Sequence, residues 1–550
     1  MKKSKKVVFL ILSILICLSF AAACGARTPT ESGPPRIQPV PQPTSTSAPA
    51  SAPPSLAPIV PPPPPAPDSG VKFAEEMDII LDVNPILAMN PFASSIGSPA
   101  AWAYNMVYDR LVYFLGDGEY GPMLAKSWET TDWQNFTFHL RDDVYFHNGE
   151  HFTAQDVVYT IGMAKEAVGT LSFDRWSTVS TATVIDPYTL KIVLSGVNVD
   201  FFFELSQPMA GIVNEKAISA DAEKGTWIGT GCFYVTEFLS NDYVKLARND
   251  DYWGEKALTQ RITIRHVPEM SAKLMQLQNG QADVVFALDP VDMPVVEADT
   301  EHFVCYKYTD NHCNMIGFNM EDPITSDLNF RMAVAHALDR DEIRLAAVGY
   351  YGFAETEGTY WGYETEFKNR GIPVIPYDPD KALEYLAASP YNGETLEITS
   401  AMMTNILAAE VVQEQLGRIG INIKINAMDI AGLGAYCRYG ENQSQILVHT
   451  GMTSLSAASI RTWYYPGANR NRTSYNNPEI TALLDEAITL TDINERRALY
   501  MHIQELLADD PTYINLFRRE DMAACVIGVG GLILIPDSYH DLRYIYKIID

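Results

Sequence analysis

Residues 28–70 hold sixteen of the 34 prolines of this 550-residue chain, mixed with serines, threonines and alanines. A stretch of this composition has too little apolar surface to form a core, and it favours extended polyproline II conformation. Folding is therefore confined to residues 71–550, and residues 25–70 are predicted to be a disordered tether. The folded part is long enough for a large core and for more than one lobe.

The first 24 residues are predicted to be a secretion signal. Four lysines within the first six residues precede an almost wholly apolar run, Val7–Phe20, and then three alanines and Cys24. This order is typical of a secretory signal, although an uncleaved anchor helix is the alternative because the run is close to membrane length. The ending is similar to the lipobox of bacterial lipoproteins, with Ala21 where that motif usually has leucine. The resemblance implies a lipid on Cys24.

Either interpretation of the N-terminus places the rest of the chain outside the cytoplasm. A lipid-modified cysteine holds a protein at a membrane without a spanning helix. We therefore expect the chain at the outer face of the bacterial cell membrane, in the periplasmic space if there are two membranes, as a monomer.

The folded part is markedly acidic. Residues 71–550 contain 34 Lys and Arg against 66 Asp and Glu, a net charge of −32. This excess argues against a nucleic-acid-binding protein, which needs a basic patch, and against polybasic contact with anionic membranes. Neutral, zwitterionic or cationic ligands are favoured. After residue 25 there is no run of 18 apolar residues, which excludes a transporter with several membrane spans.

Cysteine and histidine spacing gives no metal site. Five cysteines fall in the folded part, without a CxxC pair, and we expect them to be buried and free: Cys232, Cys305, Cys313, Cys437 and Cys525. His147 and His151 have a helical metal-ligand spacing, but Asn148-Gly149 between them is a turn signal. The sequence therefore predicts two surface histidines on a loop.

Hydrophobic periodicity alternates between helices and strands. Thr153 opens a helix with a capping-box pattern, and Asp378-Pro379 places a cap before a proline at the first helical position. A helix over Leu407–Ile419 ends at Gly420, and the alternation Ile421–Ile425 follows as a strand. Helix-to-strand repetition of this kind predicts an α/β fold with mixed sheets.

The common catalytic and nucleotide-binding motifs are absent from the sequence. There is no HExxH, G-x-S-x-G, Walker A or G-x-G-x-x-G motif, and Gly229-Thr230-Gly231 is too short for a phosphate loop. We expect no catalytic residue, no metal and no cofactor, hence no enzyme. The aromatic residues Phe136, Phe138, Tyr145 and Phe146 are predicted to be core residues, and Arg331 and Asp339 an ion pair on one helix.

Thirteen short segments in order resemble the extracellular solute-binding proteins of ABC importers, in the peptide- and nickel-binding cluster called family 5. The segments include Asn90-Pro91-Phe92, Tyr108 to Val112, Pro122 to Trp128, Phe136 to Arg141, Val144 to Gly149, Thr153 to Val157, Ile228 to Phe233, Tyr252-Trp253, Phe318-Asn319, Ala337 to Arg340, Tyr377 to Pro379, Ile419 to Ile421 and Tyr475 to Asp485. Each is weak alone, and Cys232 stands where the family usually has proline. Their order covers almost all of residues 75–540.

The resemblance implies a large periplasmic-binding-protein-like fold with three subdomains, in which two lobes close on a ligand around a hinge. Lobe I would comprise residues 71–109, 211–306 and 520–550, with an extra subdomain at 110–210. Lobe II would comprise residues 307–519. The function implied is capture of a small solute and its delivery to an ABC permease in the cytoplasmic membrane.

The resemblance also places candidate ligand contacts. These are Asn90, Phe92 and Trp227 from lobe I, and Asn319, Trp361, His449, Thr450 and Trp463 from lobe II. Peptide-binding members anchor the ligand's ammonium with an aspartate after the strand like Ile419–Ile421. The corresponding stretch here, Ile446–Ser454, contains no acid. A buried ammonium without a carboxylate is costly, so an oligopeptide-like solute and a neutral sugar or polyol both remain candidates.

Two other functions stay open beside transport. A sensor or receptor lipoprotein would keep the fold without a transporter, and a secreted hydrolase would need a catalytic group that no motif supplies. Trp463 has an alternative too, because a tryptophan in this pattern is as often a core residue as a ligand contact.

Overall fold

A computed structural model describes residues 71–549, with gaps at 82–85, 94–99, 117–118, 289–290, 310–311, 359–366, 453–458, 469 and 535–539. The predicted signal and tether, Cys24 and Trp361 lie outside the described residues. Within the described part, none of the helices is both long and apolar enough to cross a membrane.

The largest sheet has twelve strands. Its path is β17-β16-β18-β14-β19-β12-β2-β11-β10-β9, and β13 and β15 pair with β19 beside that path. The strands are β2 (Glu76–Ile80), β9 (Phe233–Leu239), β10 (Tyr243–Arg248), β11 (Arg261–Arg265), β12 (Val284–Phe286), β13 (Phe303–Thr309), β14 (His312–Phe318), β15 (Gly352–Ala354), β16 (Thr395–Ser400), β17 (Asn422–Ala427), β18 (Ile446–Met452) and β19 (Tyr513–Val526). β1 (Lys72–Phe73), β20 (Val529–Gly530) and β21 (Tyr546–Ile549) form a small separate sheet.

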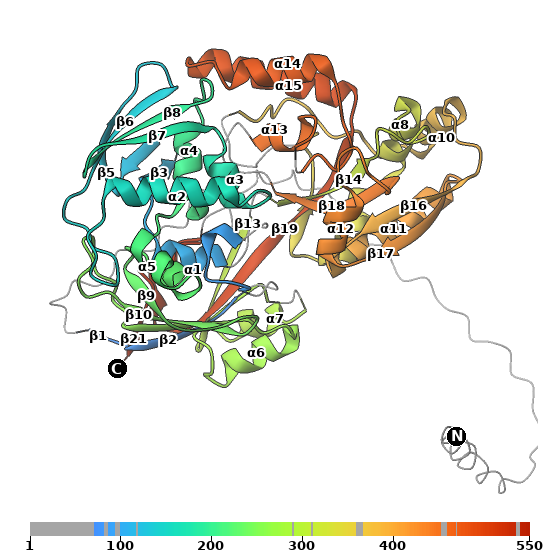
Figure 1. The fold of residues 1–550 in the computed structure, drawn as a ribbon. Coiled ribbons are helices and arrows are strands. Elements are labelled where there is room, and N and C mark those ends of the chain that lie inside the picture. Colours follow the sequence, from blue (N-terminus) through green and yellow to red (C-terminus); the bar gives the residue numbers. More distant parts are fainter. Residues whose placement is uncertain are drawn as a thin grey trace, which may run out of the picture. The chain divides into compact units, whose positions relative to one another are not determined.

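Strand β19 belongs to both halves of the large sheet (Figure 1). Its first residues, Tyr513 to Phe517, pair with β14, and Glu520 to Val526 pair with β13. Nearly all of its fourteen residues are buried, as expected for a central strand. The two halves also contain separate parallel groups, β11-β2-β12 and β17-β16-β18.

Residues 112–194 form a sheet of their own with order β5-β6-β8-β7, next to the hairpin β3-β4. The strands are β3 (Val112–Gly116), β4 (Glu119–Pro122), β5 (Ala125–Glu129), β6 (Asn135–Leu140), β7 (Val179–Asp186) and β8 (Thr189–Leu194). Phe136, Phe138 and Phe146 are buried, as predicted. The prediction for Tyr145 is wrong, because the residue is 56% exposed and its backbone pairs only with His151, in a single bridge outside the sheet.

The helices alternate with these strands as the periodicity predicts. They are α1 (Ala100–Val107), α2 (Ala154–Glu166), α3 (Leu171–Trp176), α4 (Phe201–Leu205), α5 (Glu215–Ala220), α6 (Met270–Gln278), α7 (Met293–Ala298), α8 (Leu328–Ala337), α9 (Arg340–Val348), α10 (Pro379–Ala388), α11 (Met403–Arg418), α12 (Ile430–Tyr436), α13 (Ser459–Tyr464), α14 (Pro478–Ala487) and α15 (Ile493–Asp509), with short 3₁₀ turns η1 (Pro91–Ala93), η2 (Pro208–Ala210) and η3 (Lys224–Trp227). Thr153 caps α2 in a capping box, and Asp378 caps α10 by accepting from the Lys381 amide. Gly420, at φ 90°, follows the end of α11.

Two sequence-based predictions about charged and ring side chains are wrong. Asp339 is not on the helix of Arg331, because α8 ends at Ala337 and Asp339 caps α9. Arg331 pairs instead with Asp510, and its Nε donates to the Pro511 carbonyl at 2.9 Å. His147 is not a surface histidine, since both ring nitrogens contact the backbone of the Gly229–Gly231 turn.

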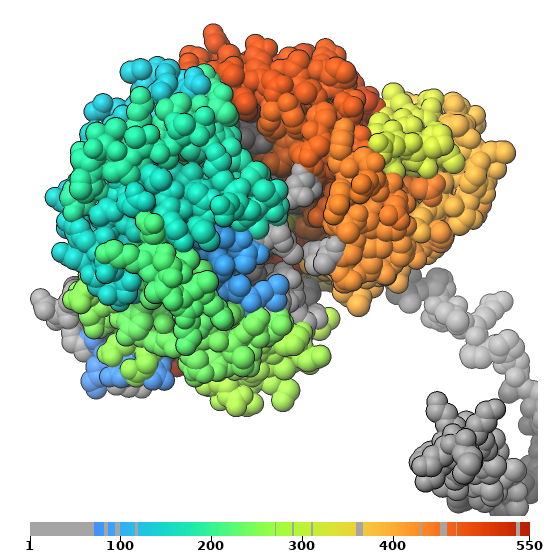
Figure 2. Space-filling model, viewed as in Figure 1, coloured from blue at the N-terminus to red at the C-terminus, as the bar shows by residue number. Residues whose placement is uncertain are grey.

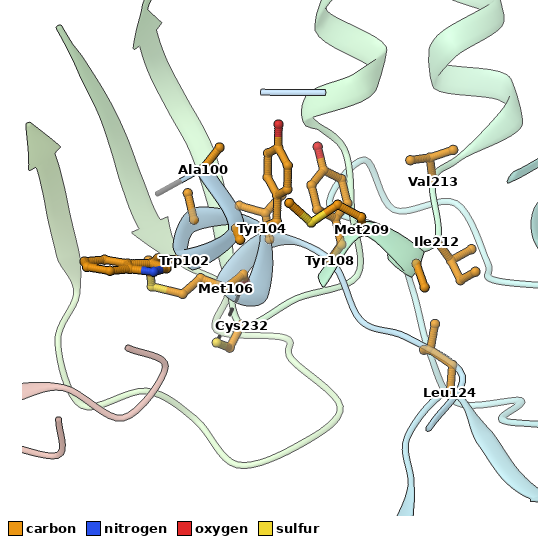
Figure 3. Close-up of a cluster of buried hydrophobic side chains, with 14 of the residues drawn as sticks. Ala100, Trp102, Tyr104, Met106, Tyr108, Leu124, Met209, Ile212, Val213 and Cys232 are labelled. Carbon is orange, nitrogen blue, oxygen red and sulfur yellow. Dashed lines mark hydrogen bonds between the residues drawn. The ribbon is translucent and has the colours of Figure 1, made fainter. Parts of the chain in front are cut away.

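Helix α1 is buried along its whole length and organises the core of the N-terminal half (Figure 3). Its residue Tyr104 lies close to Tyr108 and Met209 in that view, and all three belong to the same core as Ile212. The glycine turn lies against its last residues, where a Cβ on Gly229 would be 2.0 Å from the Val107 carbonyl oxygen. Glycine is therefore required there by close backbone approach. All five cysteines of the folded part are free, and four are buried, which confirms that prediction except at half-buried Cys305.

Candidate functional site

In open α/β sheets, ligands bind outside the carboxyl ends of parallel strands, where the strand order reverses. This protein has two such edges. One follows β2, β11 and β12, and the other follows β16, β17 and β18. Several of the predicted contacts follow β2 or lie on β18, and polar side chains are held in fixed positions at both edges.

At the first edge, Lys273 of α6 joins the ends of two strands. Its ammonium donates to the carbonyl oxygen of Leu81 at 3.0 Å and to that of Phe286 at 3.3 Å. The side chain is fully buried. A buried cation at a strand edge is a feature that the sequence analysis missed. The available signal was that Lys273 lies four residues before the apolar Leu277, a spacing that puts both on one face of α6.

Asn90 and Phe92 follow β2 in a tight turn. The Asn90 Oδ1 accepts a hydrogen bond from the Phe92 amide at 2.9 Å, and the Tyr104 hydroxyl donates to the Asn90 carbonyl at 3.0 Å. Phe92 is buried in the core. The side chain of Asn90 therefore holds the turn in shape. The turn as a whole, and not the Asn90 side chain, is the part that follows β2 at the first edge.

Trp227 belongs to a segment held against that turn. The Thr226 hydroxyl donates to the Met89 carbonyl at 3.0 Å. The Trp227 ring lies edge-on to Phe238, with centroids 6.1 Å apart, and Lys224 lies over it. The structure thus brings the segments of Asn90 and Trp227 together, as the predicted contacts require.

At the second edge, Thr450 lies in a polar network of three side chains. Its hydroxyl donates to Asn314 Oδ1 at 2.9 Å, and Asn405 Nδ2 donates to the Thr450 hydroxyl oxygen at 3.1 Å. Asn314 and Asn405 are buried, while Thr450 is half-buried. The network joins β14, β18 and the first turn of α11. Asn405 was not predicted, because only the tertiary fold brings α11 beside β18.

His449 points to the other face of β18, into an aromatic group. Its ring stacks on Trp463 with centroids 5.5 Å apart, and Tyr513 lies 6.0 Å away. Burial lowers the pKa of His449 well below its usual value, and the nearby Arg472 charge adds to this. Nδ1 lies 3.2 Å from the Thr450 carbonyl, and no partner for Nε2 is found among the described residues. Trp463 is only 2% exposed and belongs to the core of this half.

Asn319 lies away from this group. It follows β14, which is antiparallel to β18, and the register pairs Asn314 with Thr450 but Phe318 with Ile446. Asn319 is therefore at the opposite end of the strands, about 16 Å along β14 from Asn314. Its side chain donates to the Asn442 carbonyl at 3.2 Å and accepts from the Glu321 amide at 3.0 Å. The structure does not bring it together with Thr450.

Among the described residues, no group of three or more His, Cys, Asp or Glu side chains is placed to hold a metal ion. The polar groups at the two edges are amides, a hydroxyl, an imidazole and an ammonium. Such groups hold a solute by hydrogen bonds.

The sequence profile of the bacterial extracellular solute-binding proteins, family 5 (middle part), matches residues 119–481, which is more than half of the chain. The chain belongs to this family. The predicted family and the function of solute-binding component of an ABC importer are thereby confirmed.

Known relatives of this solute-binding protein span most of its length. Heme-binding protein A of Haemophilus influenzae is 25% identical over 79% of this chain and 86% of its own length. The nickel-binding periplasmic protein of Escherichia coli is 24% identical over 79% of this chain and 88% of its own.

A solved structure shows the same fold. NikA from Brucella suis in complex with Fe(III)-EDTA has a TM-score of 0.77 and 24% identity, covering 86% of this chain and 100% of that chain. The predicted fold class, an α/β periplasmic-binding-protein-like fold with mixed sheets, is confirmed.

Proposed function

We propose that this solute-binding protein captures its solute between two lobes that close about β19. Lobe I comprises residues 71–109, 211–306 and 520–550 with the extra subdomain 110–210, and lobe II comprises residues 307–519. The single observation that carries the proposal is that β19 pairs with β14 through Tyr513–Phe517 and with β13 through Glu520–Val526. A strand shared by two sheet halves is a place where a small dihedral change reorients one half.

The proposed contacts lie at the two carboxyl edges. From lobe I these are the turn of Asn90 and Phe92 and the neighbouring Trp227. From lobe II they are Thr450 with its partner Asn405, His449 through its unpaired Nε2, and Trp463 as the floor under His449. Trp361 remains a proposed contact outside the described residues. Asn319 is not included, because the register of β14 and β18 places it at the far end.

The chemistry of the second edge favours an uncharged or zwitterionic solute. Thr450, Asn314 and Asn405 offer a hydroxyl and two amides, and β18 contributes no carboxylate. A peptide-like solute held by its amide groups is the first candidate. A sugar or polyol is the second, because hydroxyl and amide side chains beside aromatic rings suit such a ligand. Two relatives are named for binding heme and nickel, so these two ligands are also included in the test.

We also propose that the protein performs no chemistry on its solute and is tethered by a lipid on Cys24. The permease would recognise the closed, solute-loaded form, so binding and release of the solute are sufficient for the protein's role. The acidic folded part gives no basic surface for a membrane, and a lipid supplies the attachment instead.

The test begins with the full-length protein extracted from expressing bacteria in mild detergent. Mass spectrometry of small molecules released from it identifies the class of solute. Di- and tripeptides, saccharides, heme and a nickel–histidine complex are then added separately while the melting temperature is measured. One class should stabilise the protein by about 2.7 kcal/mol at about 100 times its dissociation constant. If no class raises the melting temperature, and X-ray scattering shows one unchanging radius of gyration, the proposal fails.

A further inference from the structure

The extra subdomain contacts lobe II at the end of α14 and on α15. The Val199 amide donates to the Ile488 carbonyl at 3.3 Å, directly after α14. Beside it, Arg496 Nη1 of α15 lies 3.5 Å from Asp200 Oδ1, with both side chains largely buried. Figure 2 shows the orange-red surface of α14 and α15 adjoining the teal surface of this subdomain. The contact joins residues that are far apart in the sequence and belong to different proposed lobes.

The residues on each side of this contact are held in position by interactions within their own subdomain or lobe. Asn198 donates its amide to the Trp133 carbonyl at 3.0 Å, and its Oδ1 accepts from the Asp200 amide at 3.0 Å. The guanidinium of Arg496 lies over the ring of Phe367, 5.3 Å from its centroid. The two halves of the contact are therefore preformed, and they can separate without either side losing its local structure.

The ion pair is incompletely satisfied by hydrogen bonds. Asp200 Oδ2, Arg496 Nε and Arg496 Nη1 have no hydrogen-bond partner among the described residues. A buried pair of this kind gains little net stability, but removal of one partner leaves the other charge buried and uncompensated. A contact with these properties is reversible when both charges are present and strongly disfavoured when one is missing.

The groups that face Asp200 make its buried carboxylate more dependent on the charge of Arg496. They are Arg496 and Tyr500 from α15, Tyr120 from β4, and Glu204 from α4, which pairs with Arg175 of α3. Burial raises the pKa of Asp200 to about 6; Arg496 opposes the shift and Glu204 adds to it. At pH 7.5 the carboxyl is therefore ionised and depends on Arg496 for compensation.

We propose that Asp200, Arg496 and the Val199–Ile488 hydrogen bond form a latch that holds the extra subdomain against lobe II whether or not solute is bound. The inference rests on the proposed two-lobed closure. Among the described residues, the hydrogen bonds, ion pair and ring contact given for Asp200 and Arg496 involve none of the proposed solute contacts, so the latch sets how long the closed form persists without contacting the solute. Its strength then controls solute retention independently of solute identity.

The experiment measures amide hydrogen exchange of the segment 196–204 in the full-length, solute-free protein at pH 7.5. Arg496→Gln leaves the Asp200 carboxylate buried without its cation, so the Val199 amide should lose its partner and the segment should exchange at least about tenfold faster than in the wild type. Arg497→Gln is the matched control, because it removes the same charge from the next residue of α15, and exchange should stay unchanged. Near-ultraviolet circular dichroism verifies that each variant is folded.

The double variant Asp200→Asn with Arg496→Gln decides the interpretation. Replacing the carboxylate by an amide removes the buried charge, so exchange in the segment should return to within about threefold of the wild-type rate. Equal exchange in Arg496→Gln and Arg497→Gln, or failure of the double variant to restore protection, overturns the latch. The measurement uses no solute, so its outcome is separate from that of the solute panel.

Discussion

His147 Nε2 lies 2.9 Å from the carbonyl oxygen of Gly231, while His147 Nδ1 accepts a hydrogen bond from the Gly229 amide at 3.2 Å. This pattern requires a neutral ring with its proton on Nε2. Burial lowers the pKa of His147 to about 4, and the Gly231 carbonyl opposes the shift only in part. The histidine thus fastens the glycine turn to the loop that precedes α2.

His147 should make the stability of the protein depend on pH. Its folded pKa is below the unfolded value, so the unfolded chain binds the extra proton between pH 6.5 and 4, and stability from this group is present above pH 6.5 and lost on acidification. The loss reaches at most about 3 kcal/mol. In urea unfolding, the difference between wild type and His147→Gln should shrink from pH 7.5 to pH 4.5. His502→Gln, on an exposed part of α15, should show no such convergence.

Alanine substitutions at two glycines, one in the glycine turn and one on α2, should change the stability of the protein in opposite directions. Gly229→Ala should destabilise by about 1–3 kcal/mol, because its Cβ would lie 2.0 Å from the Val107 carbonyl oxygen in a packed core. Gly162→Ala, in the exposed middle of α2 with nothing within 4 Å of the new Cβ, should stabilise by about 0.5–1 kcal/mol. Thermal unfolding of both variants measures this. Equal effects would contradict the close backbone approach.

Trp463→Ala distinguishes the two roles considered for this tryptophan. It is 2% exposed and packs on His449 and Tyr513, so the solute-free protein should lose about 3–5 kcal/mol of unfolding free energy. Trp227→Ala, at a half-buried position, should cost clearly less. Urea denaturation without solute gives both values. A loss below about 1 kcal/mol at Trp463 would instead favour a ligand-facing ring.

Thr450→Val tests the second edge of the candidate site. The substitution keeps the shape of the side chain and removes the hydroxyl that joins Asn314 and Asn405. We expect at least about tenfold weaker binding of the solute identified by mass spectrometry, together with a loss of about 1–3 kcal/mol in stability because buried amides lose a partner. Thr236→Val, an exposed position on β9, should leave both quantities unchanged. Unaltered affinity in Thr450→Val removes this threonine from the site.

Cys24→Ala tests the proposed lipid tether. Without the thiol no lipid can be attached, so radiolabelled palmitate should not be incorporated, and the chain should be either released or left unprocessed at the membrane. Cys17→Ala, within the predicted signal, is the matched control and should still be labelled. Labelling that persists in Cys24→Ala excludes a lipoprotein anchored at this residue.

Local features of the fold were predictable from the sequence where neighbouring residues cause them. Thr153 caps α2 and Asp378 caps α10, because a side-chain oxygen reaches amides two or three residues ahead. The ordered motifs identified the family, since each segment forms its own turn, cap or strand. Tyr145 was placed wrongly, because aromatic alternation does not reveal where a strand stops pairing.

The candidate site was predictable only in part. The segments of Asn90 and Thr450 follow β2 and β18 and were found from the motif order. Asn405 and Lys273 were missed, because a helix residue gains its role from strands that are distant in the sequence. The position of Asn319 was decided by the antiparallel register of β14 with β18, which no local pattern expresses.

By itself the sequence determined the α/β class, the family and the absence of the catalytic motifs sought. These follow from composition and from interactions between residues a few positions apart. The tertiary structure decided that His147 is buried against Gly231, that Arg331 pairs with Asp510, and that Asp200 faces Arg496. Burial and charge pairing depend on which distant segments meet, and that is fixed only when both halves of the sheet assemble on β19.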